Sequence, residues 1–266
     1  MMKIRIAIQK SGRLNDDSLQ ILKDCGISID NGKDQLKASS RNFPMEVFYL
    51  RNGDIPQYLR DGVVDIAIIG ENVLIEKGED IAIVEKLGFS KCKVSLAVPK
   101  SVKYNSVQDF EGKRIATSYP NTVRHYLKKK GVNADLHIIT GSVEIAPNIG
   151  LADAICDIVS SGSTLFKNNL KEVEVMLKSE AVLAVSPKIS DERREILKRI
   201  QFRIQSVLQA RQFKYVLLNA PNEKLDEILA LLPGMRSPTV LPLAEENWSS
   251  VHTVINKDQF WEVIHE

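Results

Sequence analysis

The segment that most constrains the fold is the near-continuous apolar run Val63–Ile69, VVDIAII. Such a run is typical of a central strand buried on both faces of a parallel sheet. Strand and helix patterns alternate around it from residue 1 to residue 186, which predicts a parallel or mixed α/β body. About 90 residues per half indicate two lobes. We expect crossovers near Lys91 and Ser179, so that one lobe is 1–90 with 179–210 and the other is 91–178.

The pattern changes beyond a strongly helical segment at Ser190–Arg211, which Ser190 is expected to cap. The remaining residues predict a strand, a helix, two strands and a final helix. This order resembles a split βαβ unit without its last strand. We therefore expect a separate, incomplete α+β domain at 211–266, with elements at Phe213–Asn219, Pro221–Leu232, Pro238–Ala244, Ser249–Asn256 and Lys257–His265.

Composition argues against several classes of protein. The chain has 36 basic and 34 acidic residues, a net charge of +2, which is not the dense basic surface of a non-specific nucleic-acid binder. No apolar run approaches the ~18 residues of a membrane span, and the N-terminal residues read as a strand rather than a signal peptide. Cys25, Cys92 and Cys156 lie far apart in apolar segments, so we expect buried free thiols in a reducing cytoplasm.

Polar loops follow two of the predicted strands. The segment KSGR, residues 10–13, follows a strand at Lys3–Gln9, and GEN, residues 70–72, follows the apolar run. Functional groups in open α/β sheets gather at the carboxyl ends of strands, where both loops fall. Basic side chains beside a glycine can grip phosphates. One KSGR segment is a weak signal, however, because the same pattern is common in surface loops.

The strongest candidate site is Leu151–Leu165, LADAICDIVSSGSTL, where a predicted strand runs into five small residues and a helix start. Backbone N–H groups and hydroxyls of Ser160–Thr164 can converge on one anion, helped by the helix dipole. Asp153 and Asp157 are four residues apart, so on a strand they share a face. They can accept hydrogen bonds from sugar hydroxyls or hold a metal ion. A ribose-5-phosphate ligand fits this set, and an ordinary strand–turn–helix junction with a Ser/Thr cap explains the loop equally well.

Several segments together resemble ATP phosphoribosyltransferase of the long form, in order along nearly the whole chain. The matching segments are IAIQKSGRL, DGVVDIAIIGENVL, GKRIATSYPNTVRHYL, GSVEIAPNIGLADAICDIVSSGSTL, LKEVEV, RIQSVLQAR and ILALLPGMRSPTVLPL. The resemblance implies an α/β, two-lobed catalytic body like the type II periplasmic-binding proteins. It also implies a C-terminal ACT-like (ferredoxin-like) α+β regulatory domain, which here is expected to lack its last strand and part of its histidine pocket.

The resemblance implies the reaction as well. The family condenses ATP with 5-phosphoribosyl-1-pyrophosphate to N1-(5-phosphoribosyl)-ATP and pyrophosphate, the first step of histidine biosynthesis. It implies Mg²⁺ held mainly by substrate phosphates, feedback inhibition by histidine, and dimers that assemble into hexamers. We expect no nucleic-acid or membrane partner. The competing hypotheses are a solute-binding module on the same architecture and a catalytically idle regulatory subunit; the phosphate-type loops argue against both.

The resemblance assigns site residues by position. Ser160–Thr164 would cradle the 5-phosphate, and the ribose hydroxyls would meet Asp153 and Asp157, directly or through Mg²⁺. Asp153 is the better candidate because Asp157 lies deeper in the strand, where a structural, hydrogen-bonded carboxylate is the alternative. Lys10 and Arg13 would meet the pyrophosphate, and Glu71 would handle charge at the adenine. The predicted phosphoribosyl pyrophosphate site comprises Asp153, Ala154, Asp157, Ser160, Ser161, Gly162, Ser163 and Thr164. The predicted ATP site comprises Lys10, Gly12, Arg13, Gly70, Glu71, Asn72, Ser90, Cys92 (which also suits the core), Thr117, Ser118 and Tyr119.

Overall fold

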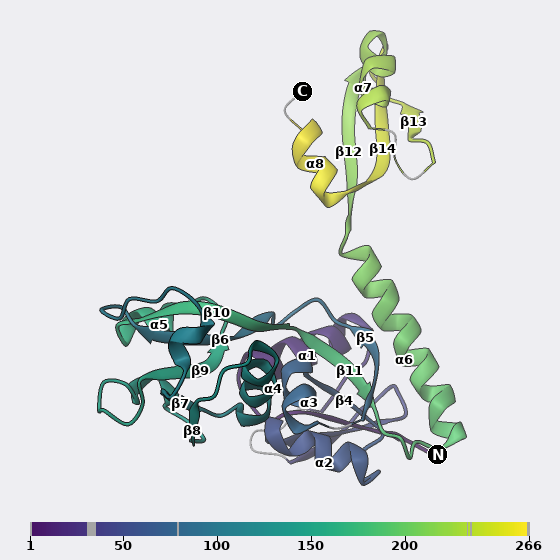
Figure 1. The fold of residues 1–266 in the computed structure, drawn as a ribbon. Coiled ribbons are helices and arrows are strands. Elements are labelled where there is room, and N and C mark those ends of the chain that lie inside the picture. The colour runs from purple at the N-terminus through teal and green to yellow at the C-terminus, as the bar shows by residue number, and fades with distance from the viewer. Residues whose placement is uncertain (1, 31–35, 79, 233, 235, 265–266) are drawn as a thin grey trace. The chain divides into compact units, whose positions relative to one another are not determined.

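The computed structural model describes all residues except 1, 31–35, 79, 233, 235 and 265–266. The chain forms two compact units, Met1–Gln201 and Phe202–Glu266. The first unit contains a six-stranded and a five-stranded sheet, and the second contains a three-stranded sheet (Figure 1). Within the described part of the chain, no helix has the length and apolar character needed to cross a membrane.

The six-stranded sheet, with its helices, is called lobe I. Its strand order is β2-β3-β1-β4-β11-β5. The strand predicted from the apolar run is β4, which lies parallel to β1 and antiparallel to β11. It begins at Ile66 rather than Val63, because the N–H groups of Val63 and Val64 donate to the Tyr58 carbonyl in a turn. The strands are β1 (Ile4–Gln9), β2 (Lys37–Ser39), β3 (Met45–Leu50), β4 (Ile66–Gly70), β5 (Ala82–Lys86) and β11 (Ala181–Val185).

Helices of lobe I follow its parallel strands. The chain enters α1 directly after β1 and α3 directly after β4, so both helices start at the carboxyl edge of the sheet. Ile6, Ile68 and Leu22 are fully buried between the sheet and its helices. The helices are α1 (Arg13–Asp24), the 3₁₀ turn η1 (Asn52–Asp54), α2 (Ile55–Arg60) and α3 (Glu71–Lys77).

The five-stranded sheet, with its helices, is called lobe II. Its order is β10-β6-β9-β7-β8, with β7 parallel to β8 and β9, and β6 antiparallel to β9 and β10. The chain passes between the two sheets after β5 and again after β10. The elements are β6 (Cys92–Pro99), η2 (Val107–Phe110), β7 (Arg114–Thr117), α4 (Pro120–Lys130), β8 (Asp135–Ile138), η3 (Val143–Ile145), β9 (Ala154–Val159), α5 (Ser163–Lys167) and β10 (Leu170–Ser179).

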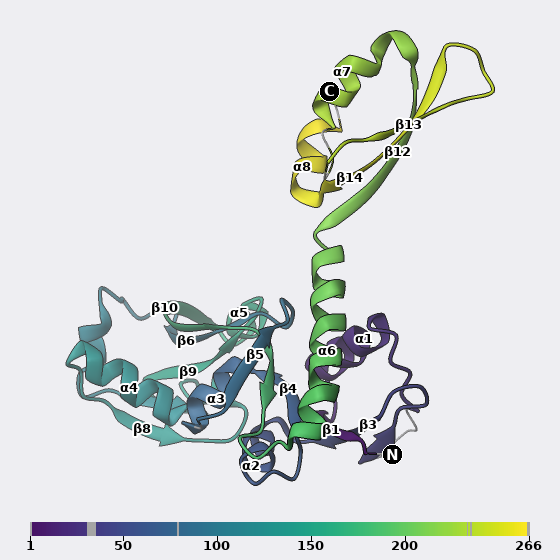
Figure 2. The same cartoon turned by 90° about the vertical axis from the view of Figure 1, so that its right-hand side faces the viewer.

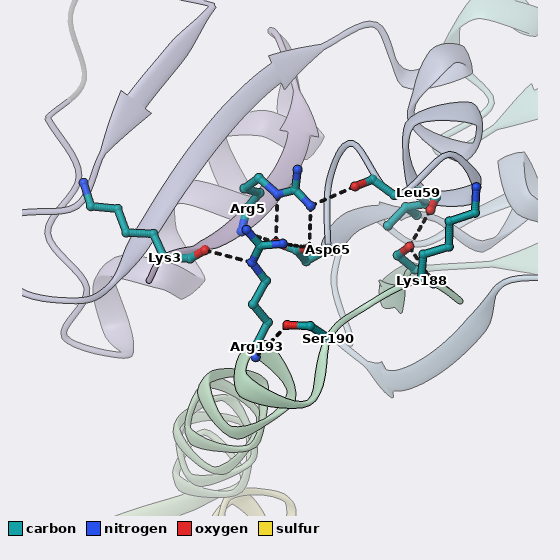
Figure 3. Close-up of polar contacts among 9 residues, drawn as sticks. Lys3, Arg5, Leu59, Asp65, Lys188, Ser190 and Arg193 are labelled. Carbon is teal, nitrogen blue, oxygen red and sulfur yellow. Dashed lines mark hydrogen bonds and ion pairs between the residues drawn. The ribbon is translucent and has the colours of Figure 1, made fainter. Parts of the chain in front are cut away.

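The long helix α6 (Asp191–Ala210) begins where it was predicted, and a buried carboxylate holds its first turn (Figure 3). Asp65, only 1% exposed, accepts hydrogen bonds from the Arg5 guanidinium at 2.8 Å and from Arg193 Nη1 at 3.3 Å. Arg193 also donates from Nε to the Lys3 carbonyl at 3.2 Å, and its N–H donates to Ser190 Oγ at 3.5 Å. Because a buried charge requires partners, these contacts fix the start of α6 on lobe I.

The second unit has the element order predicted for the C-terminal domain (Figure 2). Its sheet order is β12-β14-β13, with antiparallel pairing throughout. Val216 and Leu218 of β12 face Ile228 of α7 and Phe260 of α8 around a small apolar cavity of 180 Å³. The predicted end of the last helix, His265, lies outside the described residues. The elements are β12 (Phe213–Pro221), η4 (Asn222–Lys224), α7 (Leu225–Leu231), β13 (Thr239–Pro242), β14 (Trp248–Asn256) and α8 (Lys257–Val263).

Candidate active site between the two lobes

Two adjoining cavities of 340 and 250 Å³ lie between lobes I and II and share Lys91, Cys92 and Ser160. We call this pair of cavities the cleft. Lobe I contributes residues after the carboxyl ends of β1 and β4, and lobe II contributes the carboxyl end of β9. The lining residues are Gln9, Arg13, Leu14, Asn52, Gly70, Glu71, Asn72, Lys86, Ser90, Lys91, Cys92, Lys93, Ile158, Val159, Ser160, Lys178, Ser179 and Glu180.

Asn72 joins the two lobes at the base of the cleft. This side chain is 3% exposed; its Nδ2 donates to the Tyr119 hydroxyl at 2.9 Å and its Oδ1 accepts from Ser179 Oγ at 2.9 Å. Its backbone N–H donates to the same Ser179 oxygen at 2.9 Å. A Cβ at residue 70 would lie 2.4 Å from Asn72 Oδ1, so a larger residue there would displace the hydrogen-bonded Asn72 side chain. The structure therefore brings the predicted residues Gly70, Asn72 and Tyr119 together.

The loop at residues 10–13 reaches the cleft through Arg13. Gly12 has φ +89°, a conformation that favours glycine, and α1 begins directly after it. Arg13 Nε lies 3.8 Å from Asp17, whose carboxylate accepts a hydrogen bond from Ser90 Oγ at 2.8 Å. Ser90 itself has φ +49°, and strained backbone of this kind often occurs at ligand sites. Lys10, in the same loop, is exposed and does not line either cavity.

Asp157 lies in the second half of β9, directly before Ile158, Val159 and Ser160 of the cleft wall, although Asp157 itself lines neither cavity. Burial raises its pKa to about 6, although the Ile158 N–H donates to it at 2.8 Å, and the charge of Glu144 adds to the rise. Burial likewise raises the pKa of Tyr119, and the charge of Asp157 raises it further, which indicates that these two side chains lie close together. A partly buried carboxylate that titrates near neutrality beside a cleft is typical of a functional group.

Asp153 lies elsewhere, before the first residue of β9. Its carboxylate pairs with the Arg114 guanidinium at 3.0 Å and accepts the Arg114 N–H at 2.9 Å, contacts that lower its pKa. Asp153 and Ala154 line a different cavity of 560 Å³ with Lys113. At about 3.3 Å per residue, β9 separates Asp153 from the cleft by on the order of 20 Å. The structure therefore does not bring Asp153 or Ala154 to the loop Ser160–Thr164, as the shared strand face had suggested.

The loop Ser160–Thr164 is exposed at the carboxyl end of β9. Gly162 has φ +74°, and Ser161 Oγ lies 3.0 Å from Ser163 Oγ, so both hydroxyls face one spot. Ser160 lines both cavities of the cleft, whereas Ser161–Thr164 lie beyond the lining residues. The helix that follows, α5, has only five residues, so its dipole adds less than we expected.

Some of the remaining predicted residues line the cleft, and others lie outside its lining. Glu71 lines the cleft, with its carboxylate 3.5 Å from Lys86 Nζ. Cys92 lines both cavities, and burial raises the pKa of its thiol. Thr117 is buried and accepts the Tyr119 N–H at 2.8 Å, so it shapes the turn after β7. Ser118 does not line the cleft.

Sequence reasoning missed the residues that the crossovers contribute to the cleft, namely Lys86, Lys91, Lys93, Lys178, Ser179 and Glu180. The signal was present, because the crossovers were predicted near Lys91 and Ser179. In a two-lobed fold the connecting strands pass along the cleft, so their polar residues are candidates. Among the described residues, no group of three or more His, Cys, Asp or Glu side chains is arranged to hold a metal ion.

The fold and the cleft define a class of protein, the two-lobed type II periplasmic-binding-protein fold. A solved substrate-binding protein of an amino acid ABC transporter matches with a TM-score of 0.53 at 15% identity, covering 78% of this chain and 93% of that chain. A solved Thermotoga maritima structure, the ATP phosphoribosyl transferase (HisG:HisZ) complex, matches with a TM-score of 0.67 at 30% identity. That alignment covers 77% of this chain and 98% of the other.

Sequence profiles identify the family within this class. Residues 51–206 match the profile of ATP phosphoribosyltransferase, and residues 210–266 match that of the HisG C-terminal domain. The ATP phosphoribosyltransferases of Bacteroides thetaiotaomicron and Cytophaga hutchinsonii are 55% and 52% identical to the chain. Each alignment covers 98% of this chain, with 92% and 91% of the relatives. The chain belongs to the ATP phosphoribosyltransferase family, in its long form. The predicted fold class and enzyme class, a pentosyltransferase (EC 2.4.2.17) of histidine biosynthesis, are confirmed.

Proposed function

We propose that this protein condenses ATP with 5-phosphoribosyl-1-pyrophosphate, giving N1-(5-phosphoribosyl)-ATP and pyrophosphate in the first step of histidine biosynthesis. The observation that carries the proposal is the cleft itself. In a chain of this family, the carboxyl end of β9 meets the loops after β1 and β4 across one space of two adjoining cavities. Two substrates held there would react within a single complex, which removes much of the entropic barrier of a bimolecular reaction.

The phosphoribosyl donor is assigned to lobe II. The exposed hydroxyls and the left-handed Gly162 of the loop Ser160–Thr164 suit a 5-phosphate. Asp157, rather than Asp153, then takes the ribose, because it lies at the cleft end of the strand. With its pKa at about 6, Asp157 is ionised near neutral pH. A fixed carboxylate in a water-poor site stabilises the cationic sugar of an oxocarbenium-like transition state more strongly than it would in water.

Cations around the cleft are assigned to the leaving pyrophosphate and the ATP phosphates. Arg13 and Lys10 belong to the loop after β1, and Lys91 and Lys178 come from the two crossovers. Within the described part of the chain, neither Lys91 nor Lys178 has an ion-pair partner, so both are available to a polyanion. Gly70, Glu71, Asn72, Ser90 and Cys92 form the remaining wall, which we assign to ATP, with Glu71 placed to respond to charge at the adenine.

Mg²⁺ is the proposed cofactor. Mg²⁺ commonly binds through substrate phosphates and one or two carboxylates rather than a protein cage, which fits a cleft with few grouped acidic ligands. When bound, it would neutralise the charge that develops on the leaving pyrophosphate. We assign Glu71 of lobe I and Asp157 of lobe II as the carboxylates that would meet it.

The C-terminal unit is proposed as the regulatory domain, with histidine as feedback inhibitor and a homo-oligomeric assembly. The profile match at residues 210–266 supports a regulatory module, and the Thermotoga maritima relative was solved as a complex. We propose the domain limits 1–90 with 179–210, 91–178 and 211–266. The regulatory role is tested by truncating the chain after residue 210 and measuring activity with and without histidine. We expect histidine to inhibit the full chain and not the truncated one.

The reaction is tested by incubating the full chain with ATP, 5-phosphoribosyl-1-pyrophosphate and Mg²⁺. The proposal predicts equal amounts of pyrophosphate and of an N1-linked adduct, identified by its mass. A folded sample that binds either compound without forming the adduct would instead support a solute-binding module. Omission of each substrate in turn is the matched control.

A further inference from the structure

Helix α3 of lobe I lies beside helix α4 of lobe II, and Glu76 joins them outside the cleft. Glu76 is 8% exposed. Its Oε1 accepts the Asn121 N–H at 2.9 Å, and its Oε2 accepts both the N–H and the hydroxyl of Thr122, at 2.9 and 2.7 Å. In return, Asn121 Nδ2 donates to the Glu76 carbonyl at 2.9 Å. A single residue therefore makes four hydrogen bonds from one lobe to the other.

These bonds replace the cap that α4 lacks. The first N–H groups of any helix have no partner within the helix and need an outside acceptor. The N-cap residue of α4, Tyr119, makes no side-chain capping bond, and Pro120 has no N–H to donate. The acceptor comes from the other lobe. Within the described part of the chain Glu76 has no ion-pair partner, so the N-terminal end of α4 is what compensates its buried charge.

A second contact lies one helical turn away on the same helix. Asn72, four residues before Glu76, shares its face of α3 and donates to the Tyr119 hydroxyl at 2.9 Å. Asn72 also bonds Ser179, at the end of β10 where the chain crosses between lobes. Asn72 and Glu76 together hold the stretch Tyr119–Thr122 and the crossover. We call the bonds of Glu76 to Asn121 and Thr122 the interlobe latch.

We propose that the interlobe latch fixes the separation of the two lobes, so that Glu76 is a positioning residue for the cleft. Two-lobed proteins commonly open and close about their connecting strands. Opening here would break four hydrogen bonds, three of them to a buried carboxylate, and leave the start of α4 uncapped. Glu76 is not among the residues that line the cleft. It acts through the start of α4, where the N-cap residue Tyr119 accepts a hydrogen bond from Asn72. The kinetic part of this inference rests on the proposed function, and the geometric part does not.

The test compares two variants of Glu76, Glu76→Ala and the milder Glu76→Gln, with a variant of a helix-capping residue whose contacts stay within one lobe. Asp109 caps η2 inside lobe II by accepting the N–H of the N-cap residue Ser106 at 3.4 Å, and it also accepts the Asn105 N–H at 2.7 Å, so Asp109→Asn is the matched control. Spin labels, introduced as a non-canonical amino acid at the exposed Lys23 and Lys129, report the separation of the lobes in the full chain. Labelled chains are diluted with unlabelled ones to suppress distances between subunits.

We expect a narrow distance distribution in the otherwise unchanged chain, and a broader, longer one in Glu76→Ala. The KM for both substrates should rise roughly tenfold in Glu76→Ala, equivalent to about 1.4 kcal/mol, with a smaller change in kcat. Asp109→Asn should lower Tm and leave both the distances and KM unchanged. If Glu76→Ala does not fold, Glu76→Gln and Thr122→Val should show the same changes in smaller measure.

Two results would overturn the proposal. Distances in the Glu76 variants that match those of the unchanged chain would show that the latch does not hold the lobes. A wider separation with unchanged KM would show that the latch does not position the cleft. If no adduct forms with any variant, the proposed function fails, while the distances still decide the geometric claim.

Discussion

The two ends of β9 carry the same kind of side chain in opposite electrostatic states. Asp153, before the strand, is 42% exposed in its side chain and paired with Arg114, and its pKa is lowered. Asp157, near the other end, is partly buried and has no ion-pair partner among the residues that the structure describes, and its pKa is raised to about 6. The charge of a paired carboxylate is already neutralised by a partner within the fold. An unpaired one beside a cleft keeps its charge available to a ligand.

The direction of β9 determines which of its two ends lies at the cleft. The Asp153 N–H donates to the Arg114 carbonyl at 2.8 Å, so β9 starts beside the start of β7 and both strands run toward the cleft. Ligands in open α/β sheets bind outside the carboxyl ends of the strands. The comparison therefore supports our assignment of the ligand to Asp157, while Asp153 pairs with Arg114 at the entry to the strand.

The largest expected effect comes from Asp157→Asn. The substitution keeps the shape of the side chain and removes the charge opposite the sugar, so we expect kcat to fall by about 10²–10³-fold. Asp153→Asn should leave kcat within about twofold and lower Tm by a few degrees, because it weakens one exposed ion pair. Adduct formation and thermal unfolding of the two variants, measured side by side, check this prediction. Equal loss of turnover in both would break the comparison.

A second prediction compares the loops at the two ends of β9 by substituting one glycine in each. Gly162, in the loop after β9, and Gly150, near Asp153, both have φ +74°, and a Cβ at either meets nothing within 4 Å. Alanine at each position should therefore destabilise the fold equally, by about 1–2 kcal/mol. Only Gly162→Ala disturbs the proposed phosphate loop, and we expect it to lower kcat/KM for the phosphoribosyl donor roughly tenfold, about 1.4 kcal/mol. A similar kcat/KM in both variants would contradict the assignment of this loop.

A third prediction concerns the pH dependence of stability. Between about pH 4 and pH 6, folded Asp157 keeps a proton that the unfolded chain has lost, so Asp157 makes stability fall as pH rises through this window. The fall should be on the order of 2 kcal/mol, and Asp157→Asn should abolish it. Asp153 acts in the opposite sense, because the stability it contributes is lost as pH falls through its lowered pKa. Urea unfolding across pH 4–8 measures both; an unchanged slope in Asp157→Asn would sink this account.

The helices and strands were predictable because hydrophobic periodicity and glycine or proline boundaries define them locally. The run at Val63–Ile69 marked β4, and Ser190 marked the start of α6. The choice between Asp153 and Asp157 was not predictable in this way. A period of two places both on one strand face, and the pairing of Asp153 with Arg114, 39 residues earlier, is a long-range contact that this period does not predict.

Long-range contacts explain the other omissions. Glu76 lies in a short helix and looks from the sequence like an ordinary solvated charge, yet its partners are 45 and 46 residues away on another lobe. Ser179 bonds Asn72 across 107 residues. Local patterns carry no information about such pairs, although the predicted crossover points did indicate where the connecting strands would meet the cleft.

The most direct test of the central claim is a crystal structure of the full chain with 5-phosphoribosyl-1-pyrophosphate bound. The account predicts the 5-phosphate within hydrogen-bond distance of the loop Ser160–Thr164 and the ribose hydroxyls against Asp157. A donor bound in the cavity beside Asp153 and Arg114 would contradict it.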